Sequence, residues 1–76
     1  MSSIRSKLSI IGIMYRLREL RKERGWTQIQ VAKMLGMSQN GYSKYETGEN
    51  DIPTKILVEL AKIYSVTVDF ILELED

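Results

Sequence analysis

The sequence predicts an all-α domain, and three kinds of observation support this prediction. Apolar residues recur at intervals of three and four positions from about residue 14 onward, the spacing of one face of an α-helix. Serine and threonine residues stand directly before these segments, where they can cap a helix N-terminus. Glycines stand directly after several of them, where helices commonly end. The length of 76 residues allows one domain with one modest core.

The first predicted helix begins at about Met14. Met14, Leu17 and Leu20 form its apolar stripe. Its last turn is cationic, which suits the negative end of the helix dipole. Gly25 follows this turn and is expected to end the helix.

Two short helices with a sharp turn between them are predicted in the middle of the chain. Thr27 caps the first, and Gln30 three residues later completes a capping box. Ser38 caps the second. Gly36 stands where the first helix must stop, and Ala32 is small on the face where the helices approach. Two helices joined by a short turn that contains glycine form a helix-turn-helix unit.

Two further helices are predicted after a loop over residues 49–53. Thr54 is the expected cap of the fourth helix, whose apolar residues repeat at three and four positions. These residues are Ile56, Leu57, Leu60, Ala61 and Tyr64. Thr67 is the expected cap of a short fifth helix, with Asp69 in its first turn.

Residues 1–13 are predicted to form an N-terminal arm or extension, separate from the domain over residues 14–76. Ile4, Leu8 and Ile10 alternate with polar residues, a period of two that indicates extended backbone. Three interpretations stay open: a basic arm that reaches DNA, a strand that pairs with a second copy, or a frayed terminus. In the last case Met14 is an alternative start.

Charge and composition narrow the function classes. Residues 1–24 carry seven basic groups against two acidic ones, and residues 51–76 carry two basic against six acidic. This asymmetry suits a protein that presents one face to a polyanion; a solvated basic helix is the alternative. The chain has no cysteine and no histidine, so it lacks thiolate metal ligands and the commonest general base. No apolar run approaches the roughly 20 residues of a membrane span, and we expect a soluble cytoplasmic protein without cofactors.

From about Met14 to Leu74 the sequence resembles the Cro/repressor-type helix-turn-helix family of phage and bacterial transcription regulators. Four segments carry the resemblance: RLRELRKERGWTQ, AKMLGMSQ, YSKYETGENDIP and VTVDFIL. It implies a compact five-helix, lambda-repressor-like DNA-binding domain whose third helix enters the major groove. Tyr42 departs from the family's usual isoleucine or valine. Gly41 inside a helix is also unusual and costs about 1 kcal/mol relative to alanine; it leaves a bare patch or permits close backbone approach.

Helix geometry and the family motif together predict the contacts with base edges. Tyr42 and Tyr45 are expected to point inward, which leaves four polar residues on the outward face of the third helix. These are Gln39, Asn40, Ser43 and Lys44. The two amides can each pair with adenine through two hydrogen bonds, and the lysine can reach guanine or a phosphate. Solvated polar surface near a helix cap is the alternative for the amides.

The resemblance also implies contacts with DNA phosphates. Gln28 matches a family glutamine that binds the backbone, beside the helix N-terminus at Thr27. Thr47 and Gly48 lie where the family's loop after the third helix meets phosphates. Glu49 in that loop, together with a following aspartate, predicts a weaker electrostatic attraction.

Arg21 and Glu46 match a family ion pair that bridges the first helix to the end of the third. If the pair is buried, breaking one side costs several kcal/mol. An exposed pair contributes less than about 1 kcal/mol. The other residues with predicted structural roles are Ala32, Gly36, Tyr42 and Tyr45.

The function most consistent with the sequence is sequence-specific binding of double-stranded DNA by a homodimer that represses transcription at a two-fold-symmetric operator. The fifth helix and its surroundings are the expected dimer surface. The apolar residues there are Phe70, Ile71, Leu72 and Leu74.

Two other function classes stay open. One is an interaction module such as an antitoxin, whose main partner is a toxin. The other is a small metal-dependent nuclease. Without histidine or cysteine, such an enzyme would depend on carboxylates, and Glu46, Glu49 and Asp51 form the loop cluster available to it.

Overall fold

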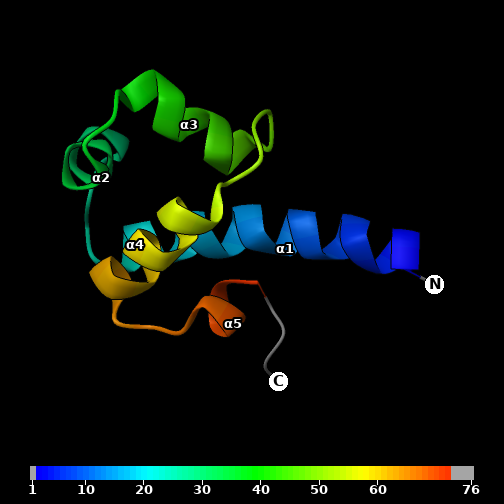
Figure 1. Ribbon diagram of the computed structural model, residues 1–76. Coiled ribbons are helices and arrows are strands. Elements are labelled where there is room, and N and C mark those ends of the chain that lie inside the picture. Colours follow the sequence, from blue (N-terminus) through cyan, green and yellow to red (C-terminus); the bar gives the residue numbers. More distant parts are fainter. Residues whose placement is uncertain (1, 73–76) are drawn as a thin grey trace.

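A computed structural model describes the backbone of residues 2–72 and the side chains of residues 12–72 (Figure 1). Five α-helices follow one another in residues 2–72, which contain no strand. They are α1 (Ser2–Glu23), α2 (Gln28–Leu35), α3 (Gln39–Thr47), α4 (Thr54–Tyr64) and α5 (Val68–Ile71). The predicted all-α fold, with α2 and α3 as the helix-turn-helix unit, is confirmed.

The hydrophobic core draws on all five helices. One residue from each helix is completely buried, at 0% exposure: Leu17, Val31, Tyr42, Leu60 and Ile71. Burying a large apolar side chain stabilises a fold by about 1.5–3 kcal/mol. In Figure 1, α1 is a long rod with α3 above it and α5 below it, and its N-terminal half extends beyond the packed body.

Side-chain caps begin three of the helices as the sequence predicts. Thr27 Oγ1 accepts a hydrogen bond from the Gln30 amide at 3.1 Å, and the Gln30 side chain accepts one from the Thr27 amide at 2.7 Å. Ser38 and Thr67 each accept one from the amide three residues onward. Gly36 ends α2 with a φ of +69°, a left-handed conformation that glycine adopts at low cost. These local contacts fix where α2 stops and α3 starts.

The start of the chain corrects one prediction. α1 begins at Ser2, so this segment is helical and forms no extended arm or strand. Short apolar runs fit more than one period. Ile4, Leu8 and Ile11 are spaced by four and three residues, the helical interval, whereas the alternation of Ile4, Leu8 and Ile10 fits a period of two. The predicted boundary between residues 13 and 14 therefore falls inside one continuous helix.

Two details near the later helices differ from expectation. Thr54 is the first residue of α4, and its cap position is Pro53, which makes no side-chain hydrogen bond. Proline presets φ, here −61°, so the helix begins after it without a side-chain cap. Ile71, expected near a dimer surface, belongs to the core of its own chain. Leu74 lies outside the described residues.

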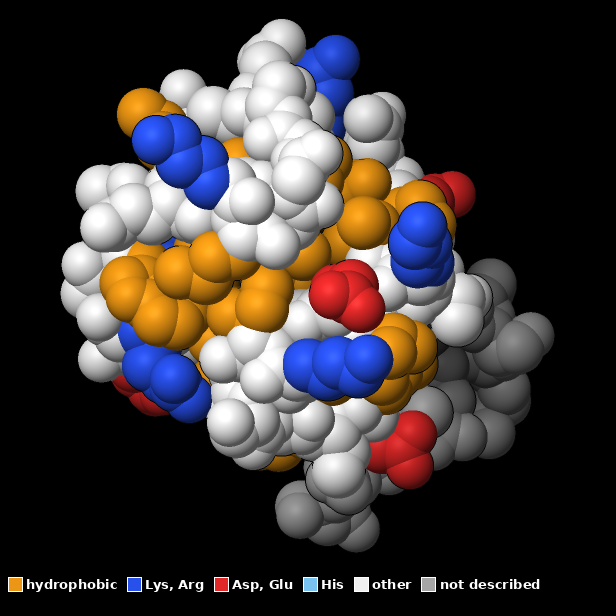
Figure 2. All heavy atoms as spheres, turned by 60° about the vertical axis from the view of Figure 1, so that its left-hand side comes forward, with side chains coloured by type: hydrophobic (Ala, Val, Ile, Leu, Met, Phe, Trp, Pro, Cys, Tyr) orange, Lys and Arg blue, Asp and Glu red, His pale blue; other side chains and the backbone are white. Residues whose placement is uncertain are grey.

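Apolar side chains also gather on the side of the molecule that carries α2 and α4 (Figure 2). The large exposed apolar residues of these two helices are Ile29, Met34 and Val58. Within residues 2–72, no helix has both the length and the apolar character needed to cross a bilayer. α3 contributes none of the large exposed apolar residues, so its outer surface is polar.

We predict that Gly48→Ala destabilises the fold more than Gly36→Ala. Both glycines have a positive φ, +82° and +69°, where an L-residue costs roughly 1–2 kcal/mol. An added Cβ at Gly36 would have no atom within 4 Å, whereas at Gly48 it would lie 2.5 Å from Met14 Sδ. Urea unfolding measures both losses. In a Met14→Ala background the two substitutions should cost about the same, and equal losses in the unmodified background would contradict the crowding at Gly48.

Candidate nucleic-acid interface

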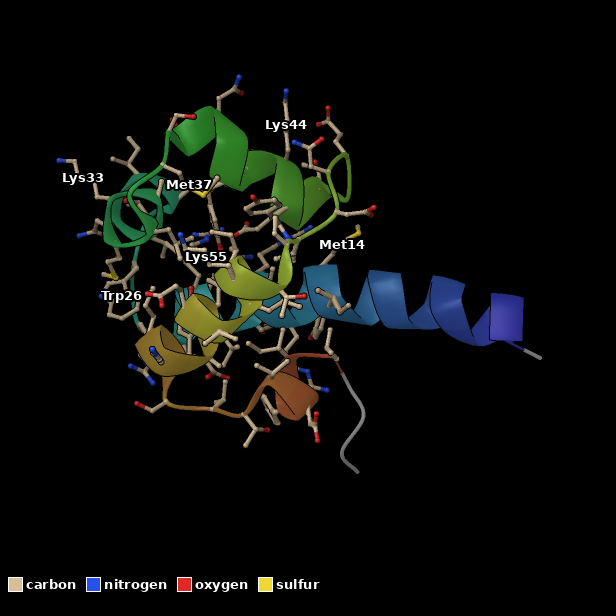
Figure 3. All side chains as sticks on the ribbon, viewed as in Figure 1. Met14, Trp26, Lys33, Met37, Lys44 and Lys55 are labelled. Atoms are coloured by element: carbon tan, nitrogen blue, oxygen red, sulfur yellow. The ribbon has the colours of Figure 1, made fainter. Side chains whose placement is uncertain are left out.

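The outward side of α3 brings the four predicted base-reading residues together. Tyr42 and Tyr45 lie on the inner side, at 0% and 8% exposure, with their rings edge to face at a centroid distance of 6.3 Å. Gln39 and Asn40 are exposed. Lys44, one turn further along, points away from the body of the molecule (Figure 3). The inward tyrosines thus present a row of polar side chains to the outside.

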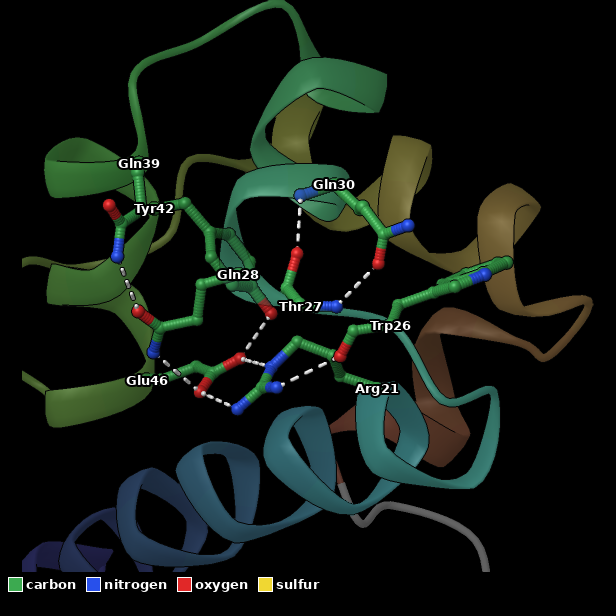
Figure 4. A network of polar contacts seen from close by, with 8 residues as sticks. All are labelled: Arg21, Trp26, Thr27, Gln28, Gln30, Gln39, Tyr42 and Glu46. Atoms are coloured by element: carbon green, nitrogen blue, oxygen red, sulfur yellow. Dashed lines mark hydrogen bonds and ion pairs between the residues drawn. The ribbon is translucent and has the colours of Figure 1, made fainter.

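A buried carboxylate, Glu46, ties α3 to α1 and α2 (Figure 4). Arg21 of α1 donates from Nε to Oε2 at 2.7 Å and from Nη2 to Oε1 at 3.0 Å. Tyr42 OH donates to Oε2 at 2.6 Å, and Gln28 Nε2 of α2 donates to Oε1 at 3.1 Å. The Arg21 and Glu46 side chains are 14% and 3% exposed. The ion pair is therefore of the buried kind, in which each partner depends on the other.

The surroundings of Glu46 keep it ionised. Burial by itself would raise the pKa of the carboxyl group, but hydrogen bonds from Arg21, Tyr42 and Gln28 outweigh burial and lower the pKa below its ordinary value. The hydrogen bond with Glu46 raises the pKa of Arg21. Burial, followed by the hydrogen bond to Glu46, raises the pKa of Tyr42. At neutral pH the site therefore holds one negative and one positive charge in direct contact.

Gln28 has a role within the protein that sequence reasoning missed. Its Nε2 donates to Glu46, and its Oε1 accepts a hydrogen bond from Gln39 Nε2 at 3.3 Å. Gln28 therefore links the buried charge to the first residue of α3. The spacing of eleven residues between the two glutamines gave no signal, because the contact depends on how α2 and α3 cross.

The other predicted phosphate contacts lie at exposed positions on either side of α3. Thr27 is exposed at the start of α2, with its hydroxyl oxygen accepting the capping hydrogen bond. Thr47 and Gly48 are exposed at the end of α3. Thr47 Oγ1 lies 3.3 Å from the Lys44 carbonyl oxygen and 3.1 Å from Glu49 Oε1. The Glu49 carboxylate therefore lies directly beside Thr47, one of the predicted phosphate contacts.

Gly41 accommodates a neighbouring side chain. A Cβ added there would lie 3.1 Å from Met37 Cε and 3.2 Å from Ser38 Oγ. Its amide donates to the same Ser38 oxygen at 3.1 Å, which forms the cap of α3. The absence of a side chain at Gly41 therefore lets Met37 pack against the first turn of α3.

Among the described side chains, no three acidic residues come together as a group that could hold a metal ion. Of the cluster considered for a nuclease, Glu46 is committed to its four hydrogen bonds. Glu49 contacts Thr47 at the surface instead.

Comparison with known proteins also identifies a helix-turn-helix domain in this chain. A family described as helix-turn-helix matches residues 17–71, which span the end of α1 and all of α2 to α5. The chain belongs to the Cro/repressor-type helix-turn-helix family. Members of this family are DNA-binding transcription regulators and not enzymes, which sets the nuclease alternative aside.

Several relatives of this chain are named as bacterial or prophage-derived regulators of transcription. The helix-turn-helix regulator YobD of Bacillus subtilis is 43% identical over 61 residues, which are 80% of this chain and 54% of YobD. The prophage-derived regulator YonR of the same organism is 38% identical over 58 residues, 76% of this chain and 54% of YonR. The chain thus spans about half the length of these relatives. No solved structure gives a significant match.

One relative carries a different kind of name. The antitoxin PezA of Streptococcus pneumoniae is 31% identical over 51 residues, which are 67% of this chain and 32% of PezA. The helix-turn-helix domain is therefore shared by proteins named as regulators and by a protein named as an antitoxin.

We predict that the stability advantage of the native chain over Glu46→Gln shrinks in acid. The pKa of Glu46 is lower in the folded state than its ordinary value of 4.5. Between those two values the unfolded state binds more protons, so the contribution of Glu46 is complete above about pH 4.5 and is lost as the pH falls through the folded-state pKa. Urea unfolding of both chains from pH 7 to pH 3 measures the difference. A constant difference over that range would contradict the role of the ionised carboxylate.

Proposed function

We propose that this protein is a sequence-specific regulator of transcription that binds double-stranded DNA with α3 in the major groove. The observation that carries the proposal is the exposed polar side of α3, held at a fixed angle by the buried Glu46 network. Recognition helices of helix-turn-helix proteins present their N-terminal residues to base edges. Such a helix must be rigid relative to the rest of the domain, and the network joins it to both α1 and α2.

Base reading is assigned to the outward residues of α3. Gln39 and Asn40, both exposed, have the donor and acceptor needed to pair with adenine N6 and N7. Lys44 suits guanine O6 and N7 or a phosphate, and Ser43 suits either kind of group. Each well-placed two-bond contact contributes roughly 1–3 kcal/mol of discrimination against a wrong base.

Phosphate binding is assigned to the flanks of α3. Thr27 and Gln28 lie at the N-terminus of α2, where backbone amides attract anions. Thr47 and Gly48 lie at the other end of α3. The Glu49 carboxylate beside Thr47 opposes phosphate at that end, so the electrostatic attraction per subunit is modest.

The operator is proposed to be two-fold symmetric, with one subunit on each half-site and half-site centres about 34 Å apart. One α3 reads a few base pairs, and a homodimer doubles the site. A dimer bound at such a site represses transcription because it excludes other proteins from the DNA. The proposed location of the protein is the cytoplasm, which contains the DNA of a bacterial cell.

A second function is supported by the likeness to the antitoxin PezA. An antitoxin of this type would bind a toxin protein in addition to DNA. Co-purification of a second polypeptide with the native chain from its own host would favour this role.

We predict that Gln39→Ala changes which operator sequence is preferred. Base-edge contacts carry sequence information, whereas backbone contacts carry none directly. Selection from a random duplex pool with the native and variant chains should show a weaker preference at one position in each half-site. An unchanged motif would refute the assignment of Gln39 to base reading.

We predict that Thr47→Ala lowers affinity for all duplexes by a similar factor and leaves the selected motif intact. Gln28→Ala should change both the affinity and the preferred sequence. It removes a phosphate contact and also the hydrogen bond that holds Gln39, so affinity falls and the preference at the Gln39 position weakens. Fluorescence anisotropy on matched and mismatched duplexes separates the two effects. A motif change with Thr47→Ala, or none with Gln28→Ala, would contradict these roles.

A further inference from the structure

Tyr64 of α4 carries a buried hydroxyl group that the proposed function does not use. The residue is 1% exposed, and its hydroxyl is the one buried side-chain polar group without a hydrogen-bond partner among the described residues. A buried tyrosine hydroxyl usually finds a partner, because an unpaired one loses its hydrogen bonds with water and gains none in the protein. The place of this hydroxyl in the fold therefore requires an explanation.

Contacts with the segment between α1 and α2 hold Tyr64 in place. The ring centroids of Trp26 and Tyr64 are 5.7 Å apart, and Arg24 Cζ lies 5.9 Å from the Tyr64 ring centroid. Arg24 also donates a hydrogen bond from Nη2 to the Tyr64 carbonyl oxygen at 2.8 Å. These contacts restrict the movement of the Tyr64 ring and so fix the direction of its hydroxyl group.

The hydroxyl group of Tyr64 faces the Glu46 network. Burial raises the pKa of Tyr64, and both Tyr42 and Glu46 also act on that pKa. Tyr64 in turn contributes to the raised pKa of Tyr42, after the larger effects of burial and Glu46. Charges and hydrogen-bonding groups shift a pKa mainly from within about 4–6 Å. α4 therefore brings a neutral hydroxyl group to the edge of the network that α1, α2 and α3 share.

Tyr42 is able to accept one more hydrogen bond. Its own O–H donates to Glu46 Oε2 at 2.6 Å (Figure 4), and a phenol oxygen can accept as well as donate. Tyr42 is completely buried, so bulk water does not compete for the lone pairs of its oxygen. A hydrogen bond from Tyr64 to Tyr42 would satisfy the donor of the first residue and the acceptor of the second.

We propose, on the basis of the DNA-binding function above, that Tyr64 is a positioning residue for α3 and acts by donating a hydrogen bond to the Tyr42 oxygen. Tyr64, Tyr42 and Glu46 then form a hydroxyl chain, in which each group donates to the next. Hydrogen bonds in such a chain polarise and strengthen one another. The donation from Tyr64 therefore strengthens the bond by which Tyr42 holds Glu46.

The hydroxyl chain adds α4 to the supports of the proposed recognition helix. α1 and α2 already hold Glu46, through Arg21 and Gln28. Gln28 also accepts a hydrogen bond from Gln39, so a change at Glu46 reaches a side chain that is proposed to read a base. Removing the Tyr64 hydroxyl should therefore alter DNA selectivity as well as stability.

Tyr64→Phe tests the proposal, because it removes one oxygen and keeps the ring contacts. Affinity for the selected duplex, measured by fluorescence anisotropy, should fall by about threefold to tenfold, within the range of one net hydrogen bond. The preference at the Gln39 position should weaken. Tyr15→Phe is the control, since Tyr15 is 63% exposed on α1, and this variant should bind as the native chain does.

An unpaired Tyr64 hydroxyl predicts the opposite result. Tyr64→Phe would then bind the duplex as tightly and as selectively as the native chain, and would be at least as stable in urea unfolding. That result would overturn the proposal. Circular dichroism of each variant verifies that the helices are intact, so that a loss of affinity reports a change in the folded domain.

Carbon-13 NMR titration of the Glu46 carboxyl group gives a readout that a loss of packing alone would not move. Tyr64→Phe should raise the folded-state pKa of Glu46, because a weaker donor at Tyr42 stabilises the ionised carboxylate less. In a Tyr42→Phe background the same substitution should leave that pKa unchanged, because the chain is already cut. Equal shifts in both backgrounds, or no shift in the native one, would overturn the hydroxyl chain.

The titration also separates this proposal from the DNA-binding function. The titratable groups around Glu46 are Arg21 from α1, Tyr42 from α3 and Tyr64 from α4, and all three have raised pKa values. None of them changes charge in acid, so the titration reports Glu46 alone. If the native chain selects no duplex, the DNA-binding proposal fails, and the titration still decides whether the hydroxyl chain exists.

Discussion

The orientation of α3 depends on one buried negative charge. Glu46 is the single charged residue that is buried among the described side chains, and its two oxygens accept hydrogen bonds from α1, α2 and α3 itself. A buried carboxylate left without such partners would cost several kcal/mol. The requirement to satisfy Glu46 therefore selects one angle for α3, which generic apolar contacts alone would define less sharply.

This arrangement couples positioning to recognition. Gln28 contacts Glu46 on one side and Gln39 on the other, so the side chain proposed to read a base is restrained by the same network that sets the helix angle. Restraining Gln39 before DNA arrives lowers the entropy lost on binding. It also means that substitutions in the buried network should alter DNA recognition although Glu46 itself is only 2% exposed.

Features that depend on a few neighbouring residues could be predicted from the sequence. The two ends of α2 are examples. The capping box joins Thr27 to Gln30, and the helix stops at Gly36, so each feature depends on residues within about one helical turn. The pairing of Arg21 with Glu46, 25 residues apart, was accessible through the family resemblance. The contact between Gln28 and Gln39 was not, because it depends on how two helices cross. The first half of α1 was mistaken for extended backbone because its apolar residues fit both a period of two and the helical period.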